Sequence, residues 1–407
     1  MRRPGRGIAV LGCLLLTLGA CSSGGAGHAR PTGSRSSAGT ASAGTVSAGT
    51  ASAGAVPSTA VSGTEAAVET ALAALDPRAR VAQLFVAGIR LDDLGGGQDL
   101  VASGVGGIFL AGRSQAAAAD LAATAASWQA AAPGPGLWIA ADQEGGLVQS
   151  LQGPGFDPLP SALAQGALPP AELAGLADRL GAQLSGAGVN LDLAPVADVV
   201  PAGTESANPP IGAVDRQYGS TAGAVVAAAG AVVAGLAAHG VTATLKHFPG
   251  LGRVQQNTDT SPQVVDGTTT ADDAQVAAFG RLAAFPAEPF VMTSSAVYST
   301  IDPAAPAAFS PAVVTDLLRG RLRFRGVVVS DDLGNAKAVE SVPVGERAVR
   351  FLAAGGTLVL TVDPTIVPAM IDAVLARADA DAGFAAQVDT AVRTALLAKA
   401  RAGLLPG

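Results

Sequence analysis

The chain of 407 residues is poor in aromatic residues, histidine, lysine and cysteine. Aromatic residues make up 4% of the chain and hydrophobic residues 49%, so we expect a core of closely packed Ala, Val and Leu. The formal net charge is -7, and no run of Lys or Arg offsets it. These properties argue against nucleic acid as a partner, because its phosphate backbone requires a basic patch.

The first 63 residues have the composition of a targeting and tethering region. Residues 1–20 join a basic start, MRRPGRG, to the apolar run IAVLGCLLLTLG, which is typical of a signal peptide. The stretch LGAC resembles a bacterial lipobox, so we predict lipidation of Cys21 and an extracytoplasmic protein anchored to the cell membrane. An ordinary secretory signal with an incidental Cys is the alternative. Since Cys13 is removed with the signal, the mature chain can form no internal disulfide.

Residues 21–63 are rich in Ser, Gly, Ala and Thr and contain the stretch SAGTASAGTVSAGTASAG. Such a segment buries too little apolar surface to offset its chain entropy. We interpret it as a disordered tether between the membrane anchor and a soluble domain over residues 64–407.

Residues 221–238, TAGAVVAAAGAVVAGLAA, contain no charge over a length that only just suffices to span a bilayer. The segment is rich in Ala and Gly rather than Leu. We therefore predict a buried helix with a small-residue face, with a transmembrane helix as the alternative.

From residue 66 onward, short apolar runs alternate with longer Ala-rich stretches of helical character. Eight such runs are expected to be strands: VAQLFVAGI from 81, VGGIFLA from 105, GLWIAAD from 136, VNLDLAPVAD from 189, VTATLKH from 241, FVMTSSAV from 290, GVVVSDD from 326 and TLVLTVD from 357. This number fits an α/β fold of the (β/α)8 barrel type, and a doubly wound open sheet is the alternative.

Polar residues decide between the two folds, because they gather at the ends of at least five of these runs. They are Asp142 and Glu144, Asp192 and Asp198, Lys246 and His247, Ser294, and Asp331 with Asp332. An open sheet concentrates ligand groups at one switch point, whereas a barrel collects them from many strands on one face. We therefore predict a single (β/α)8 barrel domain.

Three motifs carry residues suited to catalysis or binding. LKHFPGLGRVQQNTDTS, residues 245–261, places one of the three Lys beside one of the 3 His at the end of an expected strand. Arg216 follows a Pro-rich loop, where its fork of donors can grip hydroxyls or an amide. In GVVVSDD, adjacent side chains on a strand point to opposite faces, so only one of Asp331 and Asp332 can face a barrel mouth.

DQEGG, KHFPG and SDDL, in this order and on these strands, resemble the family 3 glycoside hydrolases. The most similar branch is the single-domain bacterial β-N-acetylglucosaminidases that act on cell-wall fragments. The resemblance covers about residues 75–365.

The resemblance implies roles for individual residues. Asp331 is expected to be the nucleophile that forms a glycosyl-enzyme. Asp142, Arg216, Lys246 and His247 are expected to bind the sugar in the −1 subsite. For Lys246 and His247, a buried salt bridge to a neighbouring Asp is the alternative role.

Retaining glycosidases need a second group that protonates the leaving oxygen and then activates water. In the family this is a His paired with an Asp two residues before it, but here the matching positions hold Asp259 and Asn257. A carboxylic acid can do the same work if it is enclosed, so we predict that Asp259 is the acid/base. The alternative is a solvated loop residue in a catalytically disabled protein.

The chain departs from the family pattern at other positions. Leu147 and Ser150 stand where the family has Arg, and the second of these normally contacts the sugar. Ser294 and Ser295 follow Met-Thr, where the family often has a His. These changes bear on the identity of the substrate.

The sequence thus predicts a membrane-tethered, retaining exo-β-glycosidase that removes terminal β-linked N-acetylglucosamine, most plausibly from peptidoglycan-derived sugars. It should need no metal or other cofactor, since both chemical steps use carboxylates, and we expect a monomer. A β-glucosidase of the same family, and a catalytically weak lipoprotein that binds sugar or muropeptide fragments, are the alternatives.

Overall fold

The computed structural model describes residues 58–405. The predicted signal peptide (1–20), Cys21 and most of the predicted tether (21–63) therefore lie outside the described residues. The first helix, α1 (Ser58–Ala74), begins inside the range predicted as tether.

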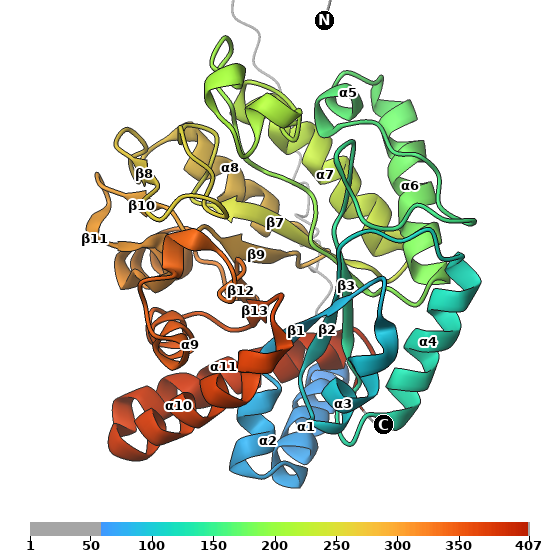
Figure 1. Cartoon of the computed structure of the whole chain (residues 1–407), viewed down its shortest axis with the longest axis vertical. Helices are drawn as coiled ribbons and strands as arrows, with labels where there is room; N and C mark the ends of the chain where they lie inside the picture. The colour runs from blue at the N-terminus through green and yellow to red at the C-terminus, as the bar shows by residue number, and fades with distance from the viewer. Residues whose placement is uncertain (1–57, 406–407) are drawn as a thin grey trace, which may run out of the picture. The chain divides into compact units, whose positions relative to one another are not determined.

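Eight parallel strands form one sheet that follows the order of the chain (Figure 1). These strands are β1 (Phe85–Arg90), β2 (Gly107–Ala111), β3 (Trp138–Ala141), β6 (Leu191–Asp192), β7 (Thr242–Phe248), β9 (Phe290–Thr293), β12 (Val328–Ser330) and β13 (Val359–Thr361). The last strand pairs with the first, and the bridge between Val329 and Leu358 joins β12 to β13. The sheet thereby closes into a (β/α)8-type barrel, as the sequence predicts.

Each of the eight predicted runs coincides with one strand of the barrel, although β1 and β7 each extend one residue beyond their run. Parallel strands are buried on both faces, and they therefore appear in a sequence as nearly continuous apolar runs. The main difference is at the first run, whose residues Val81 and Ala82 end the helix α2 (Pro77–Ala82). Strand β6 is also much shorter than its run, because the chain leaves the sheet after Asp192.

Helices surround the sheet, as Figure 1 shows, and smaller elements decorate it. The remaining helices are α3 (Gly97–Ala102), α4 (Ala118–Ala131), α5 (Ala162–Gly166), α6 (Pro170–Gly186), α7 (Ala222–Ala238), α8 (Ala274–Ala283), α9 (Val344–Ala353), α10 (Val367–Ala380) and α11 (Ala382–Arg401). The smaller elements are the hairpin β4–β5 (Gln143–Gly145, Val148–Gln149), the sheet of β8 (Val265–Asp266), β10 (Val297–Tyr298) and β11 (Asp302–Pro306), and a π-helix at Ala312–Arg321.

The uncharged segment at 221–238 forms α7, which packs against α6 and α8. Its glycines permit the close approach: a Cβ on Gly235 would lie 2.5 Å from the backbone of Ala177 in α6. The prediction of a buried helix with a small-residue face is confirmed. Within residues 58–405 no helix is long and apolar enough to cross a membrane.

The few aromatic residues are concentrated in the core. Trp138 on β3 and Phe290 on β9 meet edge to face with their ring centroids 5.2 Å apart, and both are buried. Ala, Val and Leu supply most of the other buried side chains. Large rings at a few positions, together with small residues elsewhere, fill a barrel of close-packed elements.

Candidate active site

A pocket of about 330 Å³ opens where the carboxyl ends of the barrel strands meet. All six predicted site residues line this pocket: Asp142, Arg216, Lys246, His247, Asp259 and Asp331. They come from β7, from the segments after β3 and β12, and from the loops after β6 and β7. The carboxyl ends of parallel strands converge on one face of a barrel, and this brings residues distant in sequence together.

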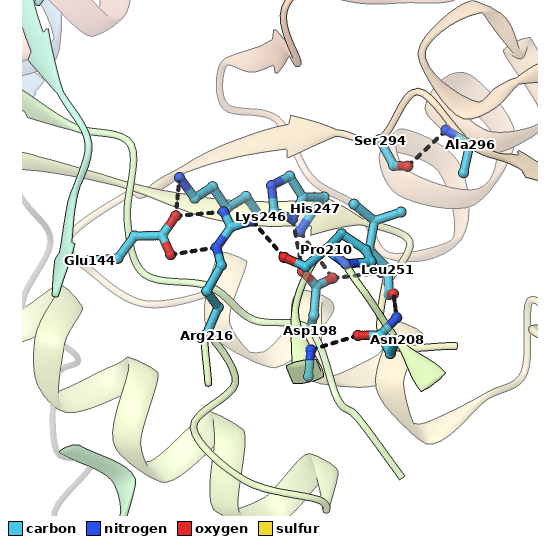
Figure 2. A network of polar contacts seen from close by, with 12 residues as sticks. Glu144, Asp198, Asn208, Pro210, Arg216, Lys246, His247, Leu251, Ser294 and Ala296 are labelled. Carbon is cyan, nitrogen blue, oxygen red and sulfur yellow. Dashed lines mark hydrogen bonds and ion pairs between the residues drawn. The ribbon is translucent and has the colours of Figure 1, made fainter. Parts of the chain in front are cut away.

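Lys246 and Arg216 form a buried ionic network with two carboxylates from the segment after β3. Figure 2 shows the contacts of Glu144 in this network. The Lys246 Nζ lies 2.6 Å from both Asp142 Oδ1 and Glu144 Oε1. Arg216 binds Glu144 with two hydrogen bonds of 2.8 and 2.7 Å. The ion pair considered as an alternative for Lys246 is therefore present, and Lys246 still lines the pocket.

Electrostatics fix the charges in this network. Burial alone would raise the pKa of Glu144, but the positive charges of Arg216 and Lys246 outweigh it and lower that pKa to about 2. Burial opposes the charge of Lys246, yet Asp142 and Glu144 raise its pKa above the usual value. Lys246 is therefore a permanent cation, able to donate to a ligand oxygen beside it.

The hairpin β4–β5, which carries Glu144, turns at a position that requires glycine. Gly145 has φ 103°, and a Cβ there would lie 2.2 Å from the Pro160 carbonyl oxygen. Only glycine adopts this backbone conformation without strain and tolerates such a contact. The Gly-Gly pair of DQEGG thus allows the chain to turn directly after Glu144, whose carboxylate contacts Lys246.

His247 is held by Asp198, which follows β6 (Figure 2). The Asp198 carboxylate accepts a hydrogen bond from the His247 backbone N–H, at 3.1 Å, and lies 2.8 Å from Nδ1 of the ring. Nε2 has no protein partner among the described residues. The peptide bond between Lys246 and His247 is cis, and both side chains line the pocket.

Asp331 and Asp332 follow β12 and differ in the partners of their carboxylates. The Asp332 carboxylate accepts hydrogen bonds from the backbone N–H groups of Gly334, Asn335 and Val362. The Asp331 carboxylate accepts one, from the N–H of Asp332, at 2.8 Å. Asp332 therefore holds the loop, and Asp331 is the member of the pair whose oxygens are available to a ligand.

Burial raises the pKa of Asp331 to about 6. The nearby His247 opposes this shift and the Asp259 carboxylate adds to it. At neutral pH Asp331 is therefore mainly ionised, which is the state that the role predicted for it requires.

Asp259 lies on the loop that follows β7, and backbone contacts hold this loop in place. The N–H groups of Lys337 and Ala338 donate to the carbonyl oxygens of Asp259 and Thr258, at 3.3 and 3.0 Å. The Asn257 side chain accepts from the Asp259 N–H at 2.8 Å. The Asp259 side chain is exposed, so the enclosure expected around it is absent, although it lines the pocket.

The other departures from the family pattern lie outside the pocket lining. Leu147 is 62% exposed at the tip of the β4–β5 hairpin, and Ser150 is buried beside it. Ser294 accepts a hydrogen bond from the Ala296 N–H at 2.9 Å, and Ser295 is buried. None of these four side chains therefore lines the pocket.

Sequence reasoning gave no role to three residues that support the site. Glu144 anchors both cations, and Asp198 orients His247. Asn208 donates to the carbonyl oxygens of Leu251 and Val254, at 2.8 and 2.7 Å, and fixes the start of the Asp259 loop. One signal for such partners was available in the sequence: a Lys or Arg that becomes buried needs a carboxylate beside it.

Comparisons with known proteins agree with this geometry. The family model for the glycosyl hydrolase family 3 N terminal domain matches residues 78–397. A β-hexosaminidase of Stenotrophomonas maltophilia is 36% identical over 284 residues, which cover 67% of this chain and 81% of that protein.

Solved structures are similar as well. The β-N-acetylhexosaminidase of Beutenbergia cavernae is 49% identical, with a TM-score of 0.77 over 80% of this chain and 98% of that one. A glycoside hydrolase family 3 β-N-acetylglucosaminidase of Paenibacillus is 31% identical, with a TM-score of 0.73 over 82% of this chain and 64% of that one.

Proposed function

Because the chain belongs to glycosyl hydrolase family 3, we propose that it removes terminal β-linked N-acetylhexosamine with retention of configuration. The observation that carries the proposal is that one pocket brings the Asp331 carboxylate together with the four residues predicted to bind the sugar, Asp142, Arg216, Lys246 and His247. Its volume of about 330 Å³ is at the lower end of the range for ligand pockets. A small pocket at the mouth of a barrel fits one terminal sugar and therefore an exo-acting enzyme.

The first chemical step forms a glycosyl-enzyme. An oxygen of Asp331 attacks the anomeric carbon, the bond from that carbon to the leaving oxygen breaks, and the general acid gives the leaving oxygen a proton. Asp142 and Lys246 bind the sugar hydroxyls. The Asp142 carboxylate is the acceptor and the Lys246 Nζ is the donor, and these two groups lie 2.6 Å apart. In the second step water attacks the anomeric carbon, loses its proton to the same general acid/base, and frees Asp331.

An activity assay with a chemical probe tests this assignment. The chain should hydrolyse p-nitrophenyl β-N-acetylglucosaminide, and Asp331→Asn should abolish turnover because an amide cannot form the ester. An activated fluorosugar should label Asp331 alone, since the Asp332 carboxylate is occupied by three backbone N–H groups. Label on Asp332 would overturn the assignment.

We assign the acid/base role to Asp259. Its loop is fixed by Asn208 at its start, and by Lys337 and Ala338 at Asp259 and the residue before it. It also lies close enough to Asp331 to raise that residue's pKa.

Azide rescue tests Asp259 directly. Asp259→Ala should lower kcat on p-nitrophenyl glycosides by about 10² to 10⁴ and lower kcat/KM less, because a good leaving group needs little protonation. Azide should restore part of the activity and yield a β-glycosyl azide, since this anion needs no base. Asn257→Ala is the matched control and should do far less. Wild-type rates in Asp259→Ala would remove the role.

The proposed substrate is a peptidoglycan-derived sugar with a terminal N-acetylglucosamine. The hexosaminidase names of the matched relatives favour N-acetylhexosamine over glucose. The Asp331 carboxylate in the pocket argues against a protein that only binds sugar. Comparing the rates on p-nitrophenyl β-N-acetylglucosaminide and β-glucoside distinguishes an N-acetylhexosaminidase from a β-glucosidase.

We also propose that the protein is a lipoprotein anchored through Cys21 outside the cytoplasm, and that it acts as a monomer. The lipobox-like LGAC and the Ser/Gly/Ala/Thr-rich segment after it support the anchor. The wild-type protein should enter the detergent phase, and Cys21→Ala should not. A Cys21→Ala protein that stays with membranes would contradict the anchor. Light scattering of the soluble variant should give the mass of one chain.

A further inference from the structure

A hollow of about 410 Å³ lies at the amino ends of the barrel strands β9 and β12. We call it the β9–β12 hollow, and its walls are residues 280–288 before β9, residues 322–326 before β12 and the last turns of α11. Met292 on β9 and Asp331 after β12 line the catalytic pocket, at the carboxyl ends of the same two strands. The hollow therefore opens on the face of the barrel opposite to the catalytic pocket, which we call the amino face.

The segment before β12 presents arginines on the amino face. Its sequence, RGRLRFRG at 319–326, alternates Arg with Gly, Leu and Phe. Phe324 is buried, and Leu322 is partly buried against α8. Arg323 and Arg325 are exposed, and both line the hollow. The apolar residues thus fix the segment to the barrel, while the arginines between them stay at the surface.

The cations of the amino face lack carboxylate partners. The exposed side chains of Arg323 and of Arg281, on the last turn of α8, form no ion pair or hydrogen bond with any described residue. Arg325 donates to a backbone carbonyl oxygen, at 2.7 Å. Glu288 is the one carboxylate residue among those described that line the hollow, and it pairs with Arg401 at 2.7 Å. The amino face therefore carries excess positive charge, although the chain has a formal net charge of -7.

Two non-glycine residues at the hollow have a positive φ, which is 58° at Arg323 and 48° at Glu288. Asp215 is the only other such residue in the described part of the chain. This region of φ favours glycine, so both side chains strain the backbone that carries them. Strained residues gather at functional surfaces, and this indicates a role for the hollow beyond folding.

An anionic lipid surface has the charge that complements the amino face. Each Arg held near such a surface strengthens binding, and the attraction falls off within a Debye length. The fold also connects the hollow to the start of the described chain. Helix α1 packs on α11, with Glu69 of α1 paired to Arg393 of α11, and the last turns of α11 line the hollow.

We propose that the amino face docks on anionic phospholipid headgroups through Arg281, Arg323 and Arg325. The inference rests on the proposed membrane location and goes beyond it, because it gives the anchored protein an orientation in which the catalytic pocket points away from the membrane. The arginines orient the protein rather than retain it. Salt screens their charges beyond about 8 Å at physiological ionic strength, so a Cys21→Ala protein, which has no lipid, still leaves the membrane there.

Binding to vesicles at low ionic strength tests the proposal in the mature chain, residues 21–407, with Cys21→Ala. This chain should sediment with vesicles of phosphatidylglycerol and phosphatidylcholine and bind them about tenfold or more tightly than vesicles of phosphatidylcholine alone. Arg281→Gln, Arg323→Gln and Arg325→Gln should each weaken the binding by about fivefold. Raising the salt concentration should abolish the difference between the two kinds of vesicle.

Three further variants separate charge from structure. Arg113→Gln removes the same charge from an exposed residue after β2, on the opposite face, and is the matched control that should leave binding unchanged. Arg323→Lys keeps the charge and should keep the binding. Arg323→Gly removes the charge and also the strain at φ 58°, so it should bind as weakly as Arg323→Gln while its unfolding in urea shows no loss of stability.

The orientation has its own measurement. The mature Cys21→Ala chain contains no cysteine, so a polarity-sensitive dye can be attached to a single introduced cysteine. A dye on Ala284→Cys, at an exposed residue that lines the hollow, should respond to anionic vesicles. A dye on Leu147→Cys, at a residue 62% exposed on the β4–β5 hairpin, should not.

Several results would overturn the proposal: equal binding to the two kinds of vesicle, equal losses with Arg113→Gln and Arg323→Gln, or equal responses of the two dyes. Displacement by inorganic phosphate at constant ionic strength would overturn it too, because the arginines would then form a discrete phosphate site. Failure of the proposed function gives different results. A wild type without activity on the p-nitrophenyl glycoside refutes the hydrolase alone, and a wild type that stays out of an uncharged detergent phase refutes the lipid anchor alone.

Discussion

Asp331 and Asp332 are neighbours with the same side chain, and the pH dependence of the reaction should follow only the first. Burial raises the pKa of Asp331 to about 6, and the nucleophile must be ionised to attack. We therefore expect kcat/KM to decline as the pH falls through about 6, approaching tenfold per pH unit below it. A pH profile on the p-nitrophenyl glycoside measures this. An acid limb near pH 4 would contradict the assignment, while Asp332→Asn should lower stability and leave the limb near 6.

Asp192 is a third carboxylate beside a network whose charges already balance. Lys246 and Arg216 pair with Asp142 and Glu144. Asp192 is fully buried, and it accepts one hydrogen bond from the Gln143 N–H while its other oxygen lacks a partner in the described structure. Burial raises its pKa to about 8, so the folded protein holds a proton there at neutral pH.

This proton makes stability depend on pH in a definite direction. The folded state binds more protons than the unfolded state between about pH 4 and 8, so the contribution of Asp192 to stability is lost as the pH rises through that interval. Asp192→Asn should remove this loss. The free energy of unfolding of the variant, relative to wild type, should rise by up to about 1.4 kcal/mol per pH unit from 4 to 8. Urea unfolding at several pH values measures it, and a constant difference between the two proteins would show that Asp192 is ionised in the fold.

Single residues also mark the limit of what the sequence predicts. All six predicted site residues reach one pocket, because their motifs combine strand ends with chemically suited side chains. The sequence did not indicate how both Lys246 and His247 come to line the pocket, since strand alternation predicts opposite faces for neighbouring residues. It also overestimated the enclosure of Asp259, because the cover over a loop depends on tertiary contacts.

At the scale of elements, the eight barrel strands were predictable and the small sheets were not. Buried parallel strands form continuous apolar runs. The hairpin β4–β5, by contrast, is only five residues of paired strand and mostly polar. Its residues stay in place through hydrogen bonds of Gln143 with Leu151 and with Asp192, which lies far from it in the sequence. Such contacts leave no local periodicity.

The helix α11 carries an element-scale prediction through Lys399. This side chain is fully buried, and its Nζ donates to Gln83 Oε1 at 2.6 Å. Burial lowers the pKa of Lys399 to about 7, so the unfolded state binds more protons between about pH 7 and 10.5 and stability rises with pH in that window. Lys399→Met removes the charge from the core.

The stability of Lys399→Met relative to wild type should therefore be highest at or below pH 7 and decline by up to about 1.4 kcal/mol per pH unit toward pH 10. Loss of the contact with Gln83 lowers the whole curve by a constant amount and leaves its slope unchanged. Lys337→Met is the matched control, because Lys337 is exposed and pairs with the exposed Glu340, and its difference from wild type should not depend on pH. Equal slopes for the two variants would mean that the pKa of Lys399 is the same in the folded and unfolded states, as for a side chain that water reaches.

At the scale of the whole molecule, the barrel and its pocket are built within residues 78–397, and α1 adds a layer outside the family match. This helix packs on α11 and buries Val68, Ala71 and Leu72. Burying a Val or Leu side chain contributes roughly 1.5–3 kcal/mol, so a chain that begins at Asp76 should lose about 3–6 kcal/mol of stability relative to one that begins at Ser58.

The two truncations separate the tether, the α1 layer and the site. A chain beginning at Ser58 should match the unfolding free energy of a Cys21→Ala chain that retains the tether, and its kcat/KM on the p-nitrophenyl glycoside should be unchanged. The chain beginning at Asp76 should unfold at lower urea but keep that kcat/KM below its unfolding transition, because none of the six pocket residues lies in α1. A loss of activity ahead of unfolding would show that α1 supports the pocket through α11, and the barrel would then depend on a segment that the family match does not contain.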